Sequence, residues 1–358
     1  MDIHKILLKY WGYSSFRPLQ EDIINAVISG KDTLALLPTG GGKSICFQVP
    51  AMAMDGVCIV VSPLIALMKD QVENLVKRNI KAASIYSGMT KREIDITLDN
   101  CVYGNIKFLY ISPERIETEI FKLRFEKMNV NLIAVDESHC ISQWGYDFRP
   151  SYLNISKLRE QKPNVPFLAL TATATPEVVI DIQKQLQFKQ EHVLQKSFER
   201  KNLSYSVLQE EDKFNRLLKI LNAVKGTSVV YVRSRKRTKE VASFLIKNGI
   251  SADFYHAGLS NDDRNKKQNN WINDITRVIV STNAFGMGID KPNVRSVVHL
   301  DLPDSLEAYF QEAGRAGRDE QKAFAVLLVE DADRQDLEQR IINSFPKIET
   351  IKQVYQAL

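Results

Sequence analysis

The sequence predicts an α/β protein with two domains, each a mostly parallel sheet flanked by helices. The chain has 358 residues, 44% hydrophobic and 25% charged. That is enough for two cores, because a domain usually holds about 100–200 residues. Short runs of Val, Ile and Leu alternate with longer segments of helical period. The alternation stops in a polar stretch, residues 183–191, and then begins again.

The apolar runs are continuous rather than alternating with polar residues, which is typical of strands buried on both faces of a parallel sheet. The expected strands of the first half are Thr33–Leu37, Val57–Val61, Lys107–Ile111, Leu132–Val135 and Phe167–Leu170. Those of the second half are Ser228–Val232, Arg277–Ser281, Ser296–Leu300 and Ala323–Val329.

The polar segment Arg200–Asn202 lies between the two sets of strands, so we expect domains over residues 1–200 and 201–333. From Asp331 onward the pattern is helical and polar. The last segment, Ile351–Leu358, is apolar with helical spacing and has no helix C-cap or stop signal. We therefore expect residues 334–358 to be the helical start of a further region.

The amino-acid composition excludes few classes of function. The 48 Lys and Arg exceed the 43 Asp and Glu by five, a mild excess compatible with a polyanionic partner. No apolar stretch could span a bilayer, so a cytoplasmic protein, associated with the nucleoid in a bacterium, is expected. We expect no zinc site and read the four widely separated cysteines as buried free thiols: Cys46, Cys58, Cys101 and Cys140.

A glycine-rich loop follows the first expected strand and leads into the apolar helix Ile45–Met54, which is the context of a phosphate-binding loop. Lys43 could reach the β and γ phosphates of ATP, and the Ser44 hydroxyl could bind Mg²⁺. Leu37 stands where the full pattern has Gly. The alternative is a glycine-rich turn that binds no nucleotide. The remaining candidate nucleotide contacts are Thr39, Gly40, Gly41 and Gly42.

Two carboxylates, Asp136 and Glu137, end a buried strand, where α/β sheets present functional groups. We expect Asp136 to hold Mg²⁺ and Glu137 to orient and deprotonate the attacking water. Alone, such a pair is more often a helix N-cap, and the phosphate loop favours the catalytic interpretation.

Near the other end, Arg315 and Arg318 are three residues apart, a spacing that we expect to place both on one helical face. Either arginine could stabilise transition-state charge on ATP. The alternative is a pair of exposed arginines in surface ion contacts.

Trp144, Phe148 and Arg149 follow the acidic pair closely, so bases stacked on the aromatics could report to Glu137. The alternative is that both aromatics are core residues. The segment Arg233–Lys239 carries five cations and no acid, and it fits a phosphate contact or a solvated helix face equally well.

The order of these motifs resembles the RecQ family of superfamily two helicases, from about residue 5 to residue 333. The phrase over residues 136–150, DESHCISQWGYDFRP, carries the resemblance most specifically. It implies two RecA-like domains, ATP and Mg²⁺, and a monomer. It also implies 3′ to 5′ movement on single-stranded DNA, with DNA junctions or duplexes bearing a 3′ overhang as partners.

The resemblance also implies residue roles. Tyr13, Arg17 and Gln20 match the adenine-recognition motif, and Arg318 is the favoured arginine finger. Backbone contacts to the tracked DNA strand are expected from Ser62, Arg115, Ser234 and Thr282.

Two departures from the family pattern matter. Ser138 stands where the family has Ala, a small-for-small change. No cysteine follows Cys140, so the usual zinc module is missing, which bears on duplex unwinding rather than on ATP hydrolysis. An RNA helicase or a translocase that does not unwind is the nearest rival. A nucleic-acid-binding scaffold with a decayed ATP site is the rival from another class.

Overall fold

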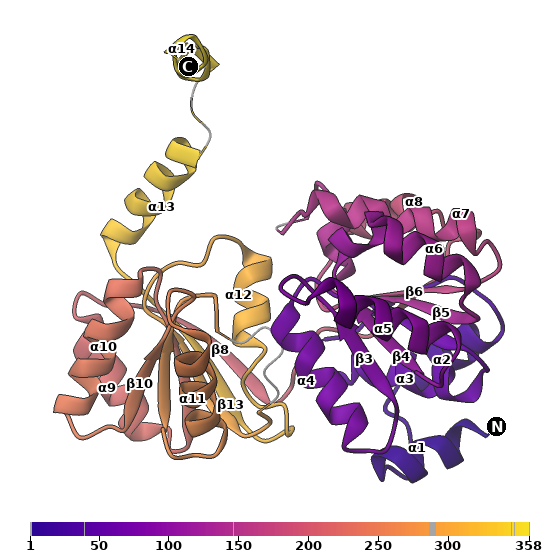
Figure 1. Ribbon diagram of the computed structural model, residues 1–358. Coiled ribbons are helices and arrows are strands. Elements are labelled where there is room, and N and C mark those ends of the chain that lie inside the picture. The colour runs from indigo at the N-terminus through magenta and orange to yellow at the C-terminus, as the bar shows by residue number, and fades with distance from the viewer. Residues whose placement is uncertain are drawn as a thin grey trace. The chain divides into compact units, whose positions relative to one another are not determined.

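The computed structural model describes residues 2–38, 40–145, 147–285, 291–344, 346 and 348–357. Its chain divides into two compact units, with the change from the first to the second between Glu199 and Arg200 (Figure 1). Each unit has its own parallel sheet. The expectation of two α/β domains built on parallel sheets is confirmed.

The first unit contains a seven-stranded sheet in the order β3-β4-β2-β5-β6-β1-β7, and neighbouring strands are all parallel. Its strands are β1 (Thr33–Leu36), β2 (Val57–Val61), β3 (Ala82–Ile85), β4 (Phe108–Ile111), β5 (Val130–Val135), β6 (Phe167–Thr171) and β7 (Val193–Gln195). Its α-helices are α1 (Ile3–Trp11), α2 (Gln20–Ile28), α3 (Lys43–Ala53), α4 (Ile65–Val76), α5 (Lys91–Val102), α6 (Glu119–Lys127), α7 (Lys157–Gln161) and α8 (Pro176–Gln185).

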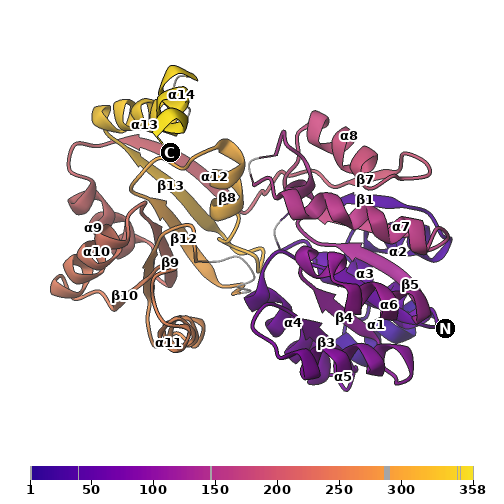
Figure 2. The same cartoon turned by 45° about the horizontal axis from the view of Figure 1, so that its top comes forward.

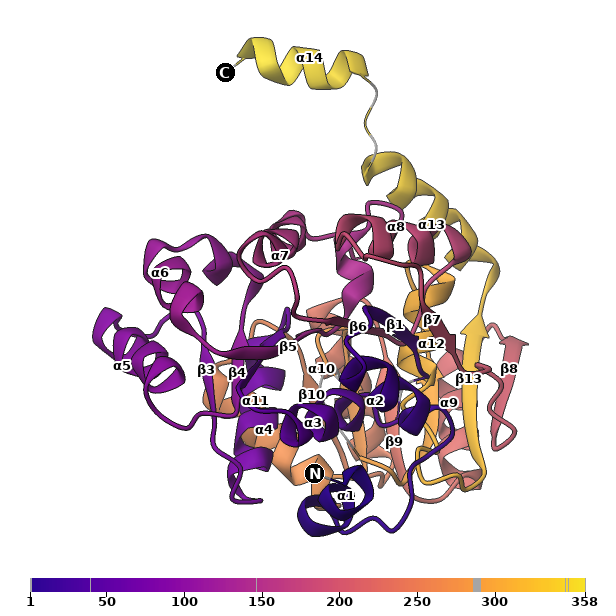
Figure 3. The ribbon, with the colours of Figure 1, turned by 90° about the vertical axis from the view of Figure 1, so that its right-hand side faces the viewer.

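Each face of this sheet carries its own core because successive side chains of a strand point to opposite faces. Leu34 and Leu36 of β1 belong to the core beneath α5, α6, α7 and α8, whereas Ala35 and Leu37 belong to the core beneath α2, α3 and α4. Figure 3 shows α6, α7 and α8 on one side of the strands and α2 and α3 on the other. Burial on both faces explains the continuous apolar runs.

The second unit contains a six-stranded parallel sheet in the order β10-β11-β9-β12-β13-β8. Its strands are β8 (Leu203–Gln209), β9 (Thr227–Tyr231), β10 (Ala252–Tyr255), β11 (Val278–Ser281), β12 (Val294–His299) and β13 (Ala323–Val329). Its helices are α9 (Lys213–Ala223), α10 (Arg235–Lys247), α11 (Asn261–Ile272), α12 (Leu306–Ala313), α13 (Asp331–Ser344) and α14 (Ile348–Ala357). Helices α9 and α10 pack together on one core, as Figure 2 shows.

The strands predicted from apolar runs all form, within a few residues at their ends. The sequence analysis missed four strands, β3, β7, β8 and β10, and each of them lies at an edge of its sheet. Edge strands need less apolar surface, as the half-exposed residues of β7 and β8 illustrate. Within the described residues, no helix is long and apolar enough to cross a membrane.

Candidate functional site

The phosphate-loop motif lies between β1 and the first turn of α3, and Thr39 lies outside the described residues. Gly42 has φ 76°, and a Cβ on Gly41 would meet the Pro38 carbonyl oxygen at 2.8 Å. Both positions therefore require glycine. Lys43 and Ser44 are the first two residues of α3, so the positive end of the helix dipole and free N–H groups face the loop. This arrangement suits a phosphate group.

Two side chains of the N-terminal segment hold the same loop. Arg17 donates from its guanidinium to the Gly40 carbonyl at 2.5 Å, and Gln20 donates from Nε2 to the Gly42 carbonyl at 3.1 Å. Gln20 is buried, whereas Tyr13 is exposed. The sequence predicted base recognition for these three residues. Contact with the glycine loop is a further role for Arg17 and Gln20 that it did not predict.

The acidic pair follows β5 directly. The Asp136 carboxylate accepts from the Glu137 N–H at 3.0 Å, and the Tyr152 hydroxyl donates to the Asp136 carbonyl at 3.0 Å. Burial and the neighbouring charge of Glu137 raise the pKa of Asp136 to about 7, and the Lys43 charge opposes that rise. Glu137 has φ 47°, a left-handed conformation that costs a non-glycine residue about 1–3 kcal/mol. Backbone strain of this kind is concentrated at functional sites.

His139 connects the acidic pair to the end of β6. Its Nδ1 lies 2.9 Å from the Thr171 hydroxyl and 3.5 Å from Oε2 of Glu137. Thr171 also donates to the Thr173 carbonyl at 3.0 Å. Burial lowers the pKa of His139, which favours the neutral imidazole. The start of the segment over residues 171–175 is thereby linked to Glu137.

The residues of this unit fit a magnesium-bound nucleotide. Ser44 and Asp136 offer the hard oxygen atoms that Mg²⁺ prefers, and Lys43 lies close enough to Asp136 to affect its pKa. Oε2 of Glu137 is buried and has no hydrogen-bond partner among the described residues. A buried carboxylate oxygen of this kind is costly unless a ligand or water satisfies it.

A second group of possible metal ligands fits a metal poorly. Atoms of His139, Cys140 and Asp147 lie within 4.8 Å of one another. However, Asp147 is paired with Arg149 at 3.0 Å, and burial raises the pKa of the Cys140 thiol well above its usual range. A metal would have to displace Arg149 from Asp147 and bind the Cys140 thiolate, whose formation burial disfavours.

The loop after the acidic pair exposes its tryptophan. Trp144 is 77% exposed, so the alternative that it is a core residue is wrong, and Phe148 is half-buried. Arg149 donates to the Pro63 carbonyl at 3.2 Å as well as pairing with Asp147. An exposed Trp in a loop held by such contacts is a ready stacking surface.

The other residues expected on a nucleic-acid track differ in accessibility. Ser62 and Thr282 are buried at strand ends, and Arg115 donates to the Tyr86 carbonyl at 2.9 Å. Ser234 is exposed and caps α10 by accepting from the Arg237 N–H at 3.1 Å.

The cation-rich segment forms the start of α10. Arg233 is bound by Asp304, and Arg237 pairs with Asp301 at 2.8 Å. The first turn of α10 has no acidic residue. Cations at a helix N-terminus are unfavourable because they meet the positive end of the dipole.

The two arginines near the C-terminal end do not share a helical face, contrary to the prediction. Helix α12 ends at Ala313, and both Arg315 and Arg318 lie in the turns that follow. Gly314 and Gly317 explain the early end, because glycine disfavours helix and Gly317 has φ 63°. Arg315 is buried, and Arg318 is half-buried.

A polar network that the sequence did not predict surrounds Arg315. His299, at the end of β12, donates from Nε2 to Oε2 of Glu312 on α12 at 2.8 Å, and its ring stacks on Tyr231. Tyr231 donates to the Phe285 carbonyl at 3.0 Å and interacts with Arg315. Tyr231, His299 and Glu312 line a cavity of about 100 Å³. Tyr231, His299 and Glu312 are far apart in the sequence, so no short sequence motif could have predicted that they meet.

A phosphate loop and an acidic strand end in one α/β unit, followed by a second α/β unit, define the class of two-unit P-loop helicase folds. Two family models match in that order: the DEAD/DEAH box helicase model over residues 17–182 and the helicase conserved C-terminal domain model over residues 212–320.

Among curated proteins, the probable ATP-dependent DNA helicase RecS of Bacillus subtilis (strain 168) is 40% identical over 361 residues, which cover 99% of this chain and 72% of that protein. The ATP-dependent DNA helicase RecQ of Pasteurella multocida (strain Pm70) is 43% identical, over 93% of this chain and 54% of that protein. The chain belongs to the RecQ family. It spans about half the length of the RecQ proteins that it matches.

Solved structures share the fold at low identity. The Mycobacterium smegmatis helicase Lhr bound to ssDNA and AMP-PNP has a TM-score of 0.72 at 20% identity, over 92% of this chain and 47% of that chain. S. cerevisiae Dbp5 L327V bound to RNA and ADP BeF3 has a TM-score of 0.73 at 17% identity, over 96% of this chain and 91% of that chain. The predicted RecA-like helicase fold is confirmed.

Proposed function

We propose that this chain is the motor core of an ATP-dependent DNA helicase that couples ATP hydrolysis to movement on single-stranded DNA. The observation that carries the proposal is the juxtaposition, in one unit, of a glycine loop, Lys43 and a strained acidic pair with an exposed Trp144 a few residues further on. Membership of the RecQ family supports DNA as the partner.

Lys43 and the loop N–H groups bind the phosphates of ATP, and Ser44 and Asp136 hold Mg²⁺, which neutralises phosphate charge. Glu137 orients the attacking water and accepts its proton, for which its buried Oε2 is suited. Tyr13, Arg17 and Gln20 recognise the adenine. In the second unit, Arg315 and Arg318 supply positive charge to the transition state, with Arg318 as the main finger.

The nucleic-acid half of the proposal depends on stacking and on phosphate contacts. Trp144 and Phe148 stack on bases, and Arg149 orients their loop through Pro63. In the second unit, a phosphate at the start of α10 would offset the unfavourable cations in its first turn, which supports a contact at Ser234. Ser62, Arg115 and Thr282 complete the proposed backbone track.

The finer parts of the proposal follow family resemblance. The core moves 3′ to 5′, acts as a monomer and prefers junctions or duplexes with a 3′ overhang. Its domains span residues 1–200 and 201–333, and the protein works at the nucleoid or elsewhere in the cytoplasm.

The test compares ATP turnover without nucleic acid, with single-stranded DNA and with single-stranded RNA of the same sequence. Stimulation by DNA well above that by RNA is expected. Stimulation by RNA alone would favour the RNA helicase, and absence of turnover would favour the scaffold. Strand separation on duplexes with a 3′ or a 5′ overhang then separates a helicase from a translocase and reports the polarity.

A further inference from the structure

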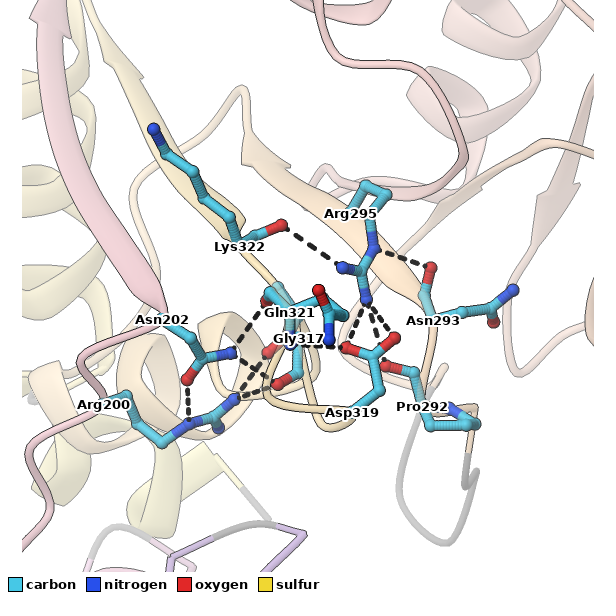
Figure 4. A network of polar contacts seen from close by, with 10 residues as sticks. Arg200, Asn202, Pro292, Asn293, Arg295, Gly317, Asp319, Gln321 and Lys322 are labelled. Carbon is cyan, nitrogen blue, oxygen red and sulfur yellow. Dashed lines mark hydrogen bonds and ion pairs between the residues drawn. The ribbon is translucent and has the colours of Figure 1, made fainter.

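The loop that carries Arg318 is held from both sides by polar contacts within the second unit (Figure 4). On one side, the Gly317 carbonyl accepts from the Arg200 guanidinium and from Nδ2 of Asn202, both at 2.7 Å. On the other side, the Asp319 carboxylate pairs with Arg295 at 2.6 Å. The residues immediately before and after Arg318 are therefore both fixed.

Gly317 itself is confined to one conformation. Its N–H donates to the Val294 carbonyl at 2.9 Å, and its φ is 63°. A Cβ at this position would meet Nδ2 of Asn202 at 2.6 Å and Cβ of Ala323 at 2.8 Å. The close approach of Asn202 thus depends on glycine, and it leaves the loop little freedom to rotate.

Arg200 and Asn202 make several contacts with this loop and few elsewhere. Arg200 also donates to the Ala316 carbonyl at 3.0 Å, and Asn202 also donates to the Gln321 carbonyl at 2.9 Å. Charged and multiple hydrogen bonds of this kind give geometric specificity as well as energy. Arg200 and Asn202, among the first residues of the second unit, therefore fix the carbonyl groups of Ala316, Gly317 and Gln321.

We propose that Arg200 and Asn202 are positioning residues for ATP hydrolysis, because they hold the backbone at Gly317 so that Arg318 is presented in a fixed orientation. The inference rests on the proposed role of Arg318 in hydrolysis. In this proposal both residues act through the Gly317 backbone and not on ATP itself. Preorganised charge is effective in catalysis because it needs no rearrangement during the reaction, and a misplacement of about 1 Å can cost up to 10²-fold in rate.

The experiment uses the full chain and four variants: Arg200→Ala, Arg200→Lys, Asn202→Ala and Asn202→Asp. Asn202→Asp keeps the shape of the side chain and removes its donor. The two alanine variants and Asn202→Asp are expected to lower kcat about 10-fold with little change in KM for ATP. Arg200→Lys keeps a charged donor and should recover part of the loss.

Arg277→Ala is the matched control for stability. Arg277 also binds main-chain carbonyls of the second unit, those of Leu221, Val224 and Gly226, but it does so at the start of β9 and β11, which β12 separates from β13 and β8 in the sheet. Its removal should lower the melting temperature without lowering kcat. A kcat loss in the Arg200 and Asn202 variants no larger than that of Arg277→Ala would overturn the proposal.

Two further measurements separate this proposal from the proposed function. Arg318→Ala should lower kcat strongly by itself. Full turnover in this variant would refute both the role of Arg318 in hydrolysis and the positioning role of Arg200 and Asn202. In the Arg318→Ala background, Asn202→Ala should add little further loss, since it acts through Arg318. An undiminished additional loss there would show that Asn202 acts by another route.

Discussion

Asp136, at the acidic strand end of the first unit, differs from three carboxylates of the second unit in its partners. In the second unit, three carboxylates have a cationic or histidine partner: Asp319 pairs with Arg295, Asp301 with Arg237, and Glu312 with His299. In the first unit, Asp136 makes no ion pair among the described residues; burial raises the pKa of both Asp136 and Asp301, but only Asp301 has a cationic partner to oppose the rise through an ion pair. Uncompensated charge is costly unless a ligand supplies the partner. The first unit is therefore prepared for a ligand, whereas the charges of the second hold its loops.

The largest expected effect is on ATP turnover and comes from removing Lys43, the cation next to Asp136. Lys43→Ala should lower ATP turnover at least ~10²–10³-fold, because the side chain serves phosphate rather than a core. The melting temperature should stay close to that of the unsubstituted protein. Normal turnover would refute the phosphate-loop assignment.

Arg159→Ala provides the contrast within the same unit. Arg159 and Asp32 form a buried ion pair at 2.6 Å, so loss of Arg159 leaves a buried carboxylate and should cost about 3 kcal/mol or more. A thermal melt of both variants should show destabilisation for Arg159→Ala only.

A second pair of substitutions divides the roles of the two carboxylates. Glu137→Gln should retain binding of ATP and Mg²⁺ and lose hydrolysis, since the amide cannot accept the proton of water. Asp136→Asn should instead change the Mg²⁺ concentration needed for ATP binding. Nucleotide titrations at several Mg²⁺ concentrations check both, and identical behaviour of the two variants would contradict the division.

Trp144→Ala should have a smaller effect that appears only with DNA. Because Trp144 is exposed, its loss should change stability by less than about 0.5 kcal/mol and leave basal ATP turnover nearly intact. Stimulation by single-stranded DNA should fall sharply, while affinity, spread over many phosphate contacts, should fall modestly. A proportionate loss of basal and stimulated rates would contradict the sensor role.

The smallest effect is expected at Ser138, where the family has Ala. Its hydroxyl is buried and lacks a hydrogen-bond partner among the described residues. Ser138→Ala should therefore stabilise the protein by up to about 1 kcal/mol, measured by denaturant titration, and leave kcat unchanged. A loss of activity would reveal a role for the hydroxyl that the present contacts do not indicate.

The sequence predicted what is encoded locally. Strands buried on both faces, such as Val57–Val61, need continuous apolar runs, and the glycine loop before Lys43 is a contiguous motif. Edge strands such as Leu203–Gln209 carry polar residues and resemble loops. The prediction that Arg315 and Arg318 share a helical face was wrong because it used their spacing alone, whereas Gly314 and Gly317 end α12 at Ala313.

The pairing of β8 with β13 has a consequence for how the second unit folds. These are the first and last strands of its sheet, and Leu203 pairs in register with Ala323. During synthesis, β8 has no partner until β13 has left the ribosome, so the unit must close a loop of more than a hundred residues late. A chain shortened before Ala323 would leave both β8 and the side of β12 without a neighbour, and would expose strand edges that favour aggregation.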